Sequence, residues 1–418
     1  MAVTPLGLAQ WLTGPSAEPV IEQALALGSL ASGASATLAA SAALRRAHPD
    51  LAPEQCAAAL TQASLRGLAS ERYGIEGTPF LTRDGLEQAT RPVIARRRAA
   101  ILAAGGCARV VDLTAGLGFD ASAFVSAGLD VTVVERSPET AALLAANVPA
   151  ARLILGDATD AGILADATES LGPADVVFID PARRDPSGRR TSDGSRAQSE
   201  RDPQRWSPPW SFVASLARLH RVCVKTTPGF PPERLPAGWQ GEWTSVAGTA
   251  TEACLWSWPV FDAPRRAVRF GKPLQSQETE FAEFEGTATV GAAHVAGVSA
   301  WLHEPDPSIV KAGLLDDLAA ALRVGRLDPG STWLSGDHPV ASPFIRSYAV
   351  IQTLPSDPKA LRRALRERGV GSLTIMGRST GIEPEALRKR LDLDGPNPAT
   401  IVLAVSQGRR VTLLVAPR

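Results

Sequence analysis

The chain has 418 residues, 44% of them apolar and 21% charged, which excludes a disordered chain and predicts two to three globular domains. Its 43 basic and 43 acidic residues cancel, which excludes a uniformly basic or acidic protein. The charge is unevenly placed, because residues 341–418 hold 13 Lys or Arg against 6 Asp or Glu, a net +7 there and −7 elsewhere. A basic segment of this kind is typical of contact with nucleic-acid phosphates.

The four cysteines stand far apart, with no Cys-x-x-Cys and no nearby His that would complete a zinc site. We therefore expect structural thiols and no metal. The N-terminal residues lack the basic and apolar parts of a signal peptide, and no 18 apolar residues run unbroken. These patterns predict a cytoplasmic protein without a membrane span.

Residues 1–106 have a helical pattern, with Ala- and Leu-rich runs separated by Gly, Pro and Ser. Thr82 is placed to cap a helix that we predict to continue from Arg83 to Ala104. This helix would lead the chain into the next domain.

From Arg109 short apolar runs alternate with helical ones, which indicates a parallel sheet with helices on both faces. The predicted strands are Arg109–Leu113, Val131–Glu135, Arg152–Leu155, Asp175–Ile179 and Arg221–Lys225, followed by Gly241–Val246 and Glu252–Trp258. The fold class is therefore α/β, a Rossmann-like domain over residues 107–260 with a mostly parallel, seven-stranded sheet.

Residues 181–209 form a polar insertion between the fourth and fifth strands, which is typical of a mobile functional loop. Residues 261–343 read as a connecting region, in which His303 begins a proline-dense turn that we expect to be structural. Residues 344–418 predict a small α+β domain, in the order β-α-β-α-β-β.

The string VVDLTAGLGFD (residues 110–120) ends the first strand in a glycine-rich turn. Gly116 and Gly118 lack a Cβ, so the chain can turn sharply there and bring its amides against a bound cofactor. Asp112 could fix this loop or meet an ammonium group of the cofactor. We assign cofactor binding to the following loop residues: Asp112, Thr114, Ala115, Gly116, Gly118 and Asp120.

Glu135 ends the second strand 19 residues after Gly116, where a carboxylate can accept both hydroxyls of a ribose. Asp157 follows the third strand and could accept from an adenine amino group. We include the neighbouring Arg136 and Ala158 in the cofactor site. A nicotinamide cofactor stays open as an alternative, although the Gly-x-Gly-x-x-Gly of dinucleotide enzymes is absent.

The string VVFIDPAR (residues 176–183) ends the fourth strand in Asp180-Pro181. A carboxylate and a neighbouring carbonyl can orient an amino group and favour the positive charge that develops on its nitrogen. Such a clamp suits methyl transfer from a sulfonium, in which the enzyme aims a lone pair at the methyl group. We assign catalysis to Asp180, Pro181 and Arg183, with Arg183 as a phosphate anchor.

The residues around these motifs resemble the class I S-adenosylmethionine-dependent methyltransferases, and Asp180-Pro-Ala-Arg183 is similar to the Asp-Pro-Pro-Tyr/Arg signature of nucleobase methylases. Over most of its length the chain further resembles a bacterial family, frequent in actinobacteria, that joins such a domain to a C-terminal THUMP-like domain. This resemblance rests on four parts of the sequence: VDLTAGLGFD (111–120), FIDPARR (178–184), HEPDP (303–307) and the basic tail. The resemblance implies an enzyme with S-adenosylmethionine as cofactor and RNA, such as tRNA, as substrate.

The chain departs from the signature where Ala182 and Arg183 replace the aromatic residue that would stack on a target base. Trp206, Trp210 or Phe230 could supply this stacking. In the tail, Lys359, Arg362, Arg363 and Arg366 share one face of a predicted helix that could follow a phosphate backbone or simply be solvated.

The function that these observations favour is methylation of a tRNA or rRNA base nitrogen by direct transfer. Two alternatives remain open: a methyltransferase for a small molecule or protein, and a noncatalytic RNA-binding protein that senses the cofactor.

Overall fold

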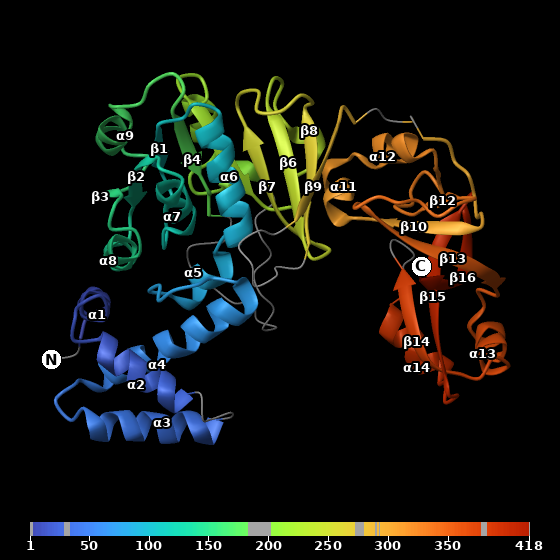
Figure 1. The fold of residues 1–418 in the computed structure, drawn as a ribbon, viewed down its shortest axis with the longest axis horizontal. Helices are drawn as coiled ribbons and strands as arrows, with labels where there is room; N and C mark the ends of the chain where they lie inside the picture. Colours follow the sequence, from blue (N-terminus) through green and yellow to red (C-terminus); the bar gives the residue numbers. More distant parts are fainter. Residues whose placement is uncertain are drawn as a thin grey trace. The chain divides into compact units, whose positions relative to one another are not determined.

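The computed structural model describes residues 3–28, 34–182, 202–271, 280–288, 291, 293–377 and 383–417. The chain divides into two compact units, one of Met1–Thr226 with Trp256–Val260 and the other of Thr227–Leu255 with Phe261–Arg418 (Figure 1). Among the described residues, no helix is both long and apolar enough to cross a membrane. The four predicted domain boundaries stay predictions.

The N-terminal region is helical, as predicted. Its described helices are α1 (Pro5–Leu12), α2 (Glu18–Gly28), α3 (Ala34–Ala47), α4 (Pro53–Leu68), a π-helical turn η1 (Ala69–Tyr73), α5 (Arg83–Gln88) and α6 (Pro92–Ala104). Proline opens α1, α4 and α6, because its missing N–H costs nothing in the first turn of a helix. Leu12, Ile21, Leu44 and Cys56 meet in one buried cluster that holds α1–α4 together.

The single helix predicted for Arg83–Ala104 is wrong, because α5 ends at Gln88 and α6 begins at Pro92. Thr82 does cap α5, as its Oγ1 accepts from the Gly85 N–H at 3.0 Å. The break follows from Pro92, whose ring disfavours helical geometry at the preceding Arg91. In the break, the Thr90 hydroxyl donates to Asp120 instead of lying on a helix surface.

The sheet of the first unit contains five parallel strands in the order β3-β2-β1-β4-β5. Their bounds are β1 (Arg109–Asp112), β2 (Asp130–Glu135), β3 (Arg152–Leu155), β4 (Val176–Ile179) and β5 (Arg221–Thr226). They confirm the five parallel strands that the sequence predicts. The helices between them are α7 (Phe119–Ser126), α8 (Pro138–Asn147), α9 (Ala161–Thr168) and α10 (Trp210–Leu216), with a short turn η2 (Pro203–Arg205).

The strand order reverses between β1 and β4, which are neighbours in the sheet although β2 and β3 separate them in the chain. Ligands of open α/β sheets bind at such a switch point, outside the carboxyl ends of the strands. Both predicted motifs, the glycine loop after β1 and Asp180 after β4, lie at this point. The fold therefore brings together two strings that are about 60 residues apart in the sequence.

The helical region packs against the glycine loop. The Asn147 side chain accepts from the Phe80 N–H at 2.8 Å and donates to the carbonyls of Phe80 and Leu117, each at 3.0 Å. Leu117 joins Leu81 and Leu86 in a buried cluster. The loop is thus held by the N-terminal helices as well as by the sheet.

The second unit begins with strands β6 (Gln240–Val246), β7 (Thr249–Trp256), β8 (Arg265–Phe270) and β9 (Phe281–Gly286), in the order β7-β6-β8-β9. A short turn η3 (Pro232–Arg234) precedes them. Here the predicted seven-stranded sheet needs correction, because β8 pairs with β6 and β9 pairs with β8 beyond the two predicted final strands. The sequence assigned Phe261 onward to a connecting region with β-like and short helical pieces, and it located neither strand.

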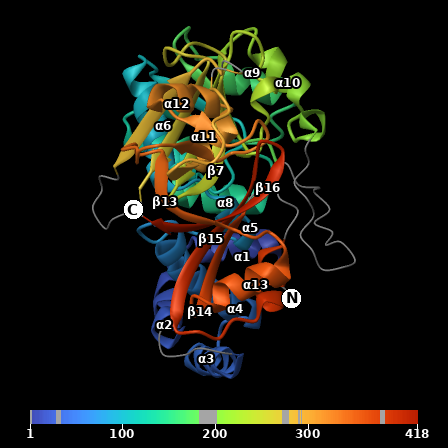
Figure 2. The same cartoon turned by 90° about the vertical axis from the view of Figure 1, so that its right-hand side faces the viewer.

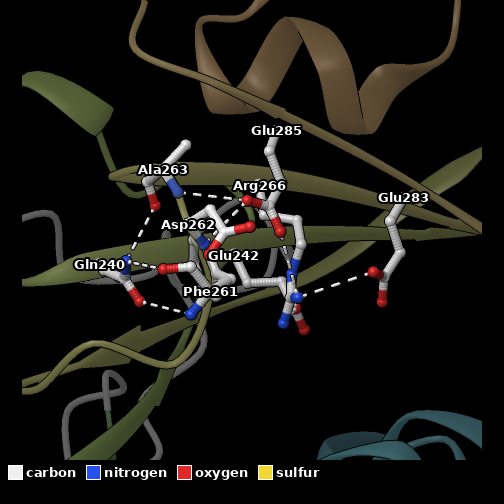
Figure 3. Close-up of polar contacts among 8 residues, drawn as sticks. All are labelled: Gln240, Glu242, Phe261, Asp262, Ala263, Arg266, Glu283 and Glu285. Carbon is white, nitrogen blue, oxygen red and sulfur yellow. Dashed lines mark hydrogen bonds and ion pairs between the residues drawn. The ribbon is translucent and has the colours of Figure 1, made fainter.

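An ionic cluster built around the buried Arg266 and Glu242 ties β6, β8 and β9 together, and Figure 3 shows it. Arg266 of β8 donates to Glu242 of β6 at 2.8 Å and lies 3.5–3.6 Å from Glu285 and Glu283 of β9. Glu242 and Glu285 are the cross-strand neighbours of Arg266, which explains the contacts. We call these four residues the Arg266 cluster.

A second sheet follows, in the order β11-β12-β10-β13-β16-β15-β14. Its bounds are β10 (Trp301–Pro305), β11 (Gly325–Arg326), β12 (Leu334–Gly336), β13 (Ile345–Leu354), β14 (Val370–Gly377), β15 (Asn397–Ser406) and β16 (Arg409–Pro417), with helices α11 (Pro307–Ala312), α12 (Leu315–Leu322), α13 (Pro358–Arg366) and α14 (Pro384–Leu391). The tail from β13 to β16 has the predicted order β-α-β-α-β-β. Figure 2 shows α13 beside the long strands of this sheet, where Leu361 and Leu365 enter the core.

The proline turn predicted at His303-Glu-Pro-Asp-Pro307 is instead a junction in which His303 to Pro305 end strand β10 and Pro307 begins helix α11. His303 is fully buried and bonds to the Ser347 hydroxyl at 3.0 Å, and its burial lowers its pKa to about 4. Asp306 caps α11 and accepts from the Ser245 hydroxyl of β6 at 2.6 Å. The junction between β10 and α11 thereby connects the two sheets of the second unit.

Candidate functional site

The glycine loop between β1 and α7 needs glycine at two positions. Gly116 and Gly118 have φ of 55° and 85°, in the left-handed region that other residues rarely adopt. A Cβ on Gly118 would lie 2.5–2.6 Å from Leu144 and Val148. A Cβ on Gly116 would meet nothing within 4 Å. Gly118 is therefore required for packing against α8, whereas Gly116 faces open space.

Asp112 fixes this loop from inside. Its side chain is buried, and its Oδ1 accepts from the Thr114 N–H at 3.0 Å. Burial raises the pKa of Asp112 to about 8, and the nearby carboxylates of Asp120 and Asp180 act in the same direction. Of the two roles considered for Asp112, the hydrogen bond supports the first, loop fixation.

Glu135 at the end of β2 holds the other side of the loop. Its carboxylate accepts from the Gly116 N–H at 3.1 Å and from the Ser137 N–H at 2.8 Å. Burial raises the pKa of Glu135, although these backbone hydrogen bonds offset part of the effect. Glu135 thus connects the end of β2 to the glycine that faces open space.

Asp157 lies after β3, with its Oδ1 accepting from the amide and the hydroxyl of Thr159. These hydrogen bonds hold the pKa of Asp157 below its usual value. The neighbouring Ala158 is buried, whereas Arg136 after β2 is exposed. The acids predicted for the cofactor therefore stand at the ends of three successive strands, β1, β2 and β3.

Asp180 lies at the end of β4, next to the glycine loop. Its N–H donates to the Thr114 hydroxyl at 2.6 Å, so the two predicted motifs are directly bonded. Beyond the buried Pro181, Ala182 exchanges two backbone hydrogen bonds with Ser207. Arg183 lies outside the described residues, and its assignment stays a prediction.

Lys225 near the end of β5 pairs with Asp180, its Nζ lying 2.5 Å from Asp180 Oδ2. The same Nζ lies 3.7 Å from Asp120 of α7, which also bonds to Arg98 of α6 and to the Thr90 hydroxyl. Burial alone would raise the pKa of Asp120, but Arg98, Lys225 and Thr90 together hold it below its usual value. We call Asp180, Lys225, Asp120 and Arg98 the clamp network.

Sequence reasoning placed Asp120 with the cofactor and did not identify Lys225, Arg98 or Thr90. Asp120 is buried among these partners, and cofactor contact by its side chain stays a prediction. One signal was available for Lys225, because it is a charged residue that directly follows the apolar residues 222–224 of this strand. Arg98 carried no such signal, since a helix with five alanines and three arginines shows no clear buried face in its sequence.

The three aromatic residues considered for base stacking are mostly enclosed. Trp206 and Phe230 are buried, and the Phe230 carbonyl accepts from the Trp243 indole at 3.2 Å. Trp210 is half-buried and meets Trp206 edge to face at 6.3 Å. Trp210 is therefore the most accessible of the three.

The basic face of α13 is partly neutralised within the tail. Arg362 donates to Asp392 at 2.6 Å, and Arg366 donates to the Asp392 carbonyl at 2.8 Å. Arg363 lies 3.9 Å from Glu367 one turn later. Lys359 on the same helix is exposed.

Two sequence families match the chain: residues 82–186 match "Putative SAM-dependent methyltransferase", and residues 345–417 match "THUMP domain-like". An uncharacterized S-adenosylmethionine-dependent methyltransferase, from two strains of Mycobacterium tuberculosis, is 31% identical over 328 residues, covering 78% of this chain and 84% of that protein. Ribosomal RNA small subunit methyltransferase J of Alkalilimnicola ehrlichii is 34% identical over 184 residues, covering 41% of this chain and 63% of that protein.

Among solved structures, a putative methyltransferase from Porphyromonas gingivalis W83 is similar over 99% of this chain and 98% of its own, with a TM-score of 0.67. At 19% sequence identity this likeness shows a shared fold. It includes the helical N-terminal region and the α+β tail, because it extends over nearly the whole chain.

Proposed function

Since the chain belongs to the S-adenosylmethionine-dependent methyltransferases, we propose that it methylates a base nitrogen of RNA, in tRNA or rRNA. The THUMP-like tail supports an RNA substrate, as do relatives named ribosomal RNA small subunit methyltransferase J, which match part of the chain. The proposal that the chain catalyses methyl transfer rests on the hydrogen bond that the Asp180 N–H donates to the Thr114 hydroxyl. It holds an Asp-Pro clamp directly against the glycine loop.

The residues at the strand ends fit S-adenosylmethionine. The open space at Gly116 leaves room for a ligand against the backbone, and the half-buried Glu135 lies beside it as an acceptor for ribose hydroxyls. Asp157 is more exposed and is suited to an adenine amino group. When bound, the cofactor supplies an electrophilic methyl group on a sulfonium, which a nucleophile displaces in line.

Asp180 and the adjoining Pro181 carbonyl would orient the acceptor nitrogen. A carboxylate accepting from an amino group aims the nitrogen lone pair and stabilises the positive charge that develops during transfer. The rigid Pro181 removes a competing donor and limits the conformations of the turn. The chain's own contribution is therefore chiefly orientation and electrostatic stabilisation.

RNA contact by the tail is compatible with its internal ion pairs. The pairs of Arg362, Arg363 and Arg366 involve carboxylates that are exposed, and such surface pairs are worth only about 0–1 kcal/mol. Phosphates can therefore replace the carboxylates at small cost. Binding through these arginines and Lys359 should weaken steeply as salt is raised.

The pairing of the α13 arginines also favours one rival, a methyltransferase for a small molecule or protein whose tail makes protein contacts. The rival predicts cofactor binding without salt-sensitive affinity for tRNA or rRNA. A filter-binding series from 50 to 200 mM salt separates the two, because each phosphate contact adds about 0.9 to the slope of log affinity against log salt.

The decisive experiment is radiolabelled methyl transfer to total RNA from a strain that lacks the gene, followed by mass spectrometry of the nucleosides. We expect label in one methylated nucleoside, and no label in RNA from the parent strain, where the site is already modified. Absence of label from both RNAs, with the cofactor bound, would reject an RNA substrate.

A further inference from the structure

Lys225 occupies an unusual place for a lysine. It lies on the central strand β5 and is 6% exposed. A buried ammonium group is costly unless it is paired, so its partners determine what it does. Lys225 forms ion pairs with the carboxylates of Asp180 and Asp120.

The two carboxylates are not equivalent. Asp120 is already bonded to Arg98 through Oδ1 and to Thr90 through Oδ2, and Lys225 lies 3.7 Å away, too far for a hydrogen bond. The 2.5 Å contact with Asp180 Oδ2 is therefore the direct one. Asp120 supplies a fixed negative charge that holds the ammonium group in place.

Exposure also differs along the network. The side chains of Lys225 and Asp120 are 8% exposed, whereas that of Asp180 is 23% exposed. The cation thus lies beneath a carboxylate that reaches solvent at the carboxyl end of β4. Lys225 and Thr114 hold Asp180 at two points, the first by its side chain and the second by its backbone N–H.

We propose that Lys225 is a positioning residue for methyl transfer, which binds Asp180 Oδ2 so that Oδ1 is presented to the acceptor nitrogen. The inference rests on the proposed function, because it assigns Asp180 to the acceptor. It differs from a purely structural pair in its consequence. An apolar replacement of Lys225 lowers stability, because it removes a buried cation from the network, but it also releases the Asp180 side chain, and misplacement of a catalytic group by about 1 Å costs roughly 100-fold in rate.

The test compares Lys225→Met with Lys225→Arg in the full-length protein. Methionine matches the length of lysine without its charge, and arginine restores a donor. The matched control is Thr226→Val, the next residue on β5, which is equally buried and whose Oγ1 lacks a hydrogen-bond partner among the described residues. Single-turnover rate, KM for RNA and cofactor affinity are measured for each, with thermal unfolding to verify the fold.

We expect Lys225→Met to lower the rate about 100-fold while cofactor affinity stays near that of the wild type. Lys225→Arg should recover part of the rate, and Thr226→Val should keep all of it. A Lys225→Met enzyme that keeps the wild-type rate, or that loses cofactor affinity as much as rate, would overturn the inference.

A crystal structure of Lys225→Met separates this inference from the proposed function. If the wild type does not methylate RNA, the proposed function fails, and the structure still decides the role of Lys225. An Asp180 side chain that has left its position supports the positioning role. An Asp180 side chain that has not moved overturns it.

Discussion

Each unit contains an ionic cluster with buried charges, the clamp network in one and the Arg266 cluster in the other, and they differ in what surrounds them. The clamp network has two cations and two carboxylates at the carboxyl ends of β4 and β5 and on helices α6 and α7. The Arg266 cluster has one cation and three carboxylates on the bodies of β6, β8 and β9. In both, an arginine lies over a phenylalanine ring, Arg98 over Phe178 and Arg266 over Phe261.

The comparison shows that buried charge alone does not identify a functional site. The Arg266 cluster follows from strand pairing, because its glutamates are cross-strand neighbours or lie two residues from one. The clamp network joins the ends of the paired strands β4 and β5 to helices α6 and α7, and it ends in a carboxylate whose own N–H is bonded to the glycine loop. Position at a topological switch point, and not burial, separates the two.

The largest expected effect is that of Asp180→Asn on methyl transfer. Asparagine keeps an oxygen for Lys225, so the fold is preserved, but it loses the negative charge that faces the developing positive charge. We expect turnover to fall by about 1000-fold or more, with cofactor affinity nearly unchanged. Calorimetric titration of the cofactor and a labelled-methyl assay measure the two quantities. Methylation at the wild-type rate would show that Asp180 has no role in catalysis. The functional difference between the two clusters would then disappear.

Arg266→Met should have the opposite profile. It leaves the buried Glu242 without its cation, and breaking a buried pair costs about 3–5 kcal/mol. We expect the second unit to unfold at lower urea concentration, while the rate of methyl transfer by the folded protein stays that of the wild type. A selective loss of rate, without loss of stability, would show that the Arg266 cluster is functional.

Asp112, beside the clamp network, makes the stability of the folded protein depend on pH. Its pKa is raised to about 8 in the folded protein from a usual value near 3.8, so the folded state binds a proton that the unfolded state releases. This contribution to stability is complete below the unfolded pKa and is lost as the pH rises through the folded pKa, at up to about 1.4 kcal/mol per pH unit.

Asp112→Asn should therefore flatten the decline in the free energy of unfolding between pH 4 and pH 8. Asparagine stays neutral and keeps an acceptor for the Thr114 N–H. Urea titrations at several pH values compare the variant with the wild type. Parallel pH profiles for the two proteins would show that Asp112 ionises at its usual pKa.

Much of the fold follows from local sequence signals. The alternation of apolar strands and helices after Arg109 predicted all five parallel strands, and Gly116 and Asp180 predicted where the chain turns at their ends. The prediction of one helix over Arg83–Ala104 was wrong because Pro92 interrupts it. Strand β8 was not predicted because its charged residues, Arg266 among them, do not alternate as they do in a half-buried strand.

The sequence predicted the acidic residues of the candidate site but not its basic residues. Carboxylates at strand ends can be located by their spacing along the chain, because a strand-helix-strand unit has a nearly fixed length. Lys225 and Arg98 pair with acids 45 and 22 residues away, across elements whose packing no local pattern specifies. Their roles require the three-dimensional arrangement.

The smallest expected effect concerns Thr114, which was assigned to the cofactor but whose hydroxyl accepts the Asp180 N–H. Thr114→Val keeps the shape of the side chain and removes this acceptor, which costs about 1–3 kcal/mol for a group left without a partner. We expect a fall in the methylation rate of about tenfold, with the loop intact because the Thr114 N–H still bonds Asp112. Thr140→Val, in the first turn of α8, is the control. A Thr114→Val enzyme with a normal rate but weakened cofactor binding would show that Thr114 contacts the cofactor, as first assigned. Lys225 would then be the main residue that positions Asp180.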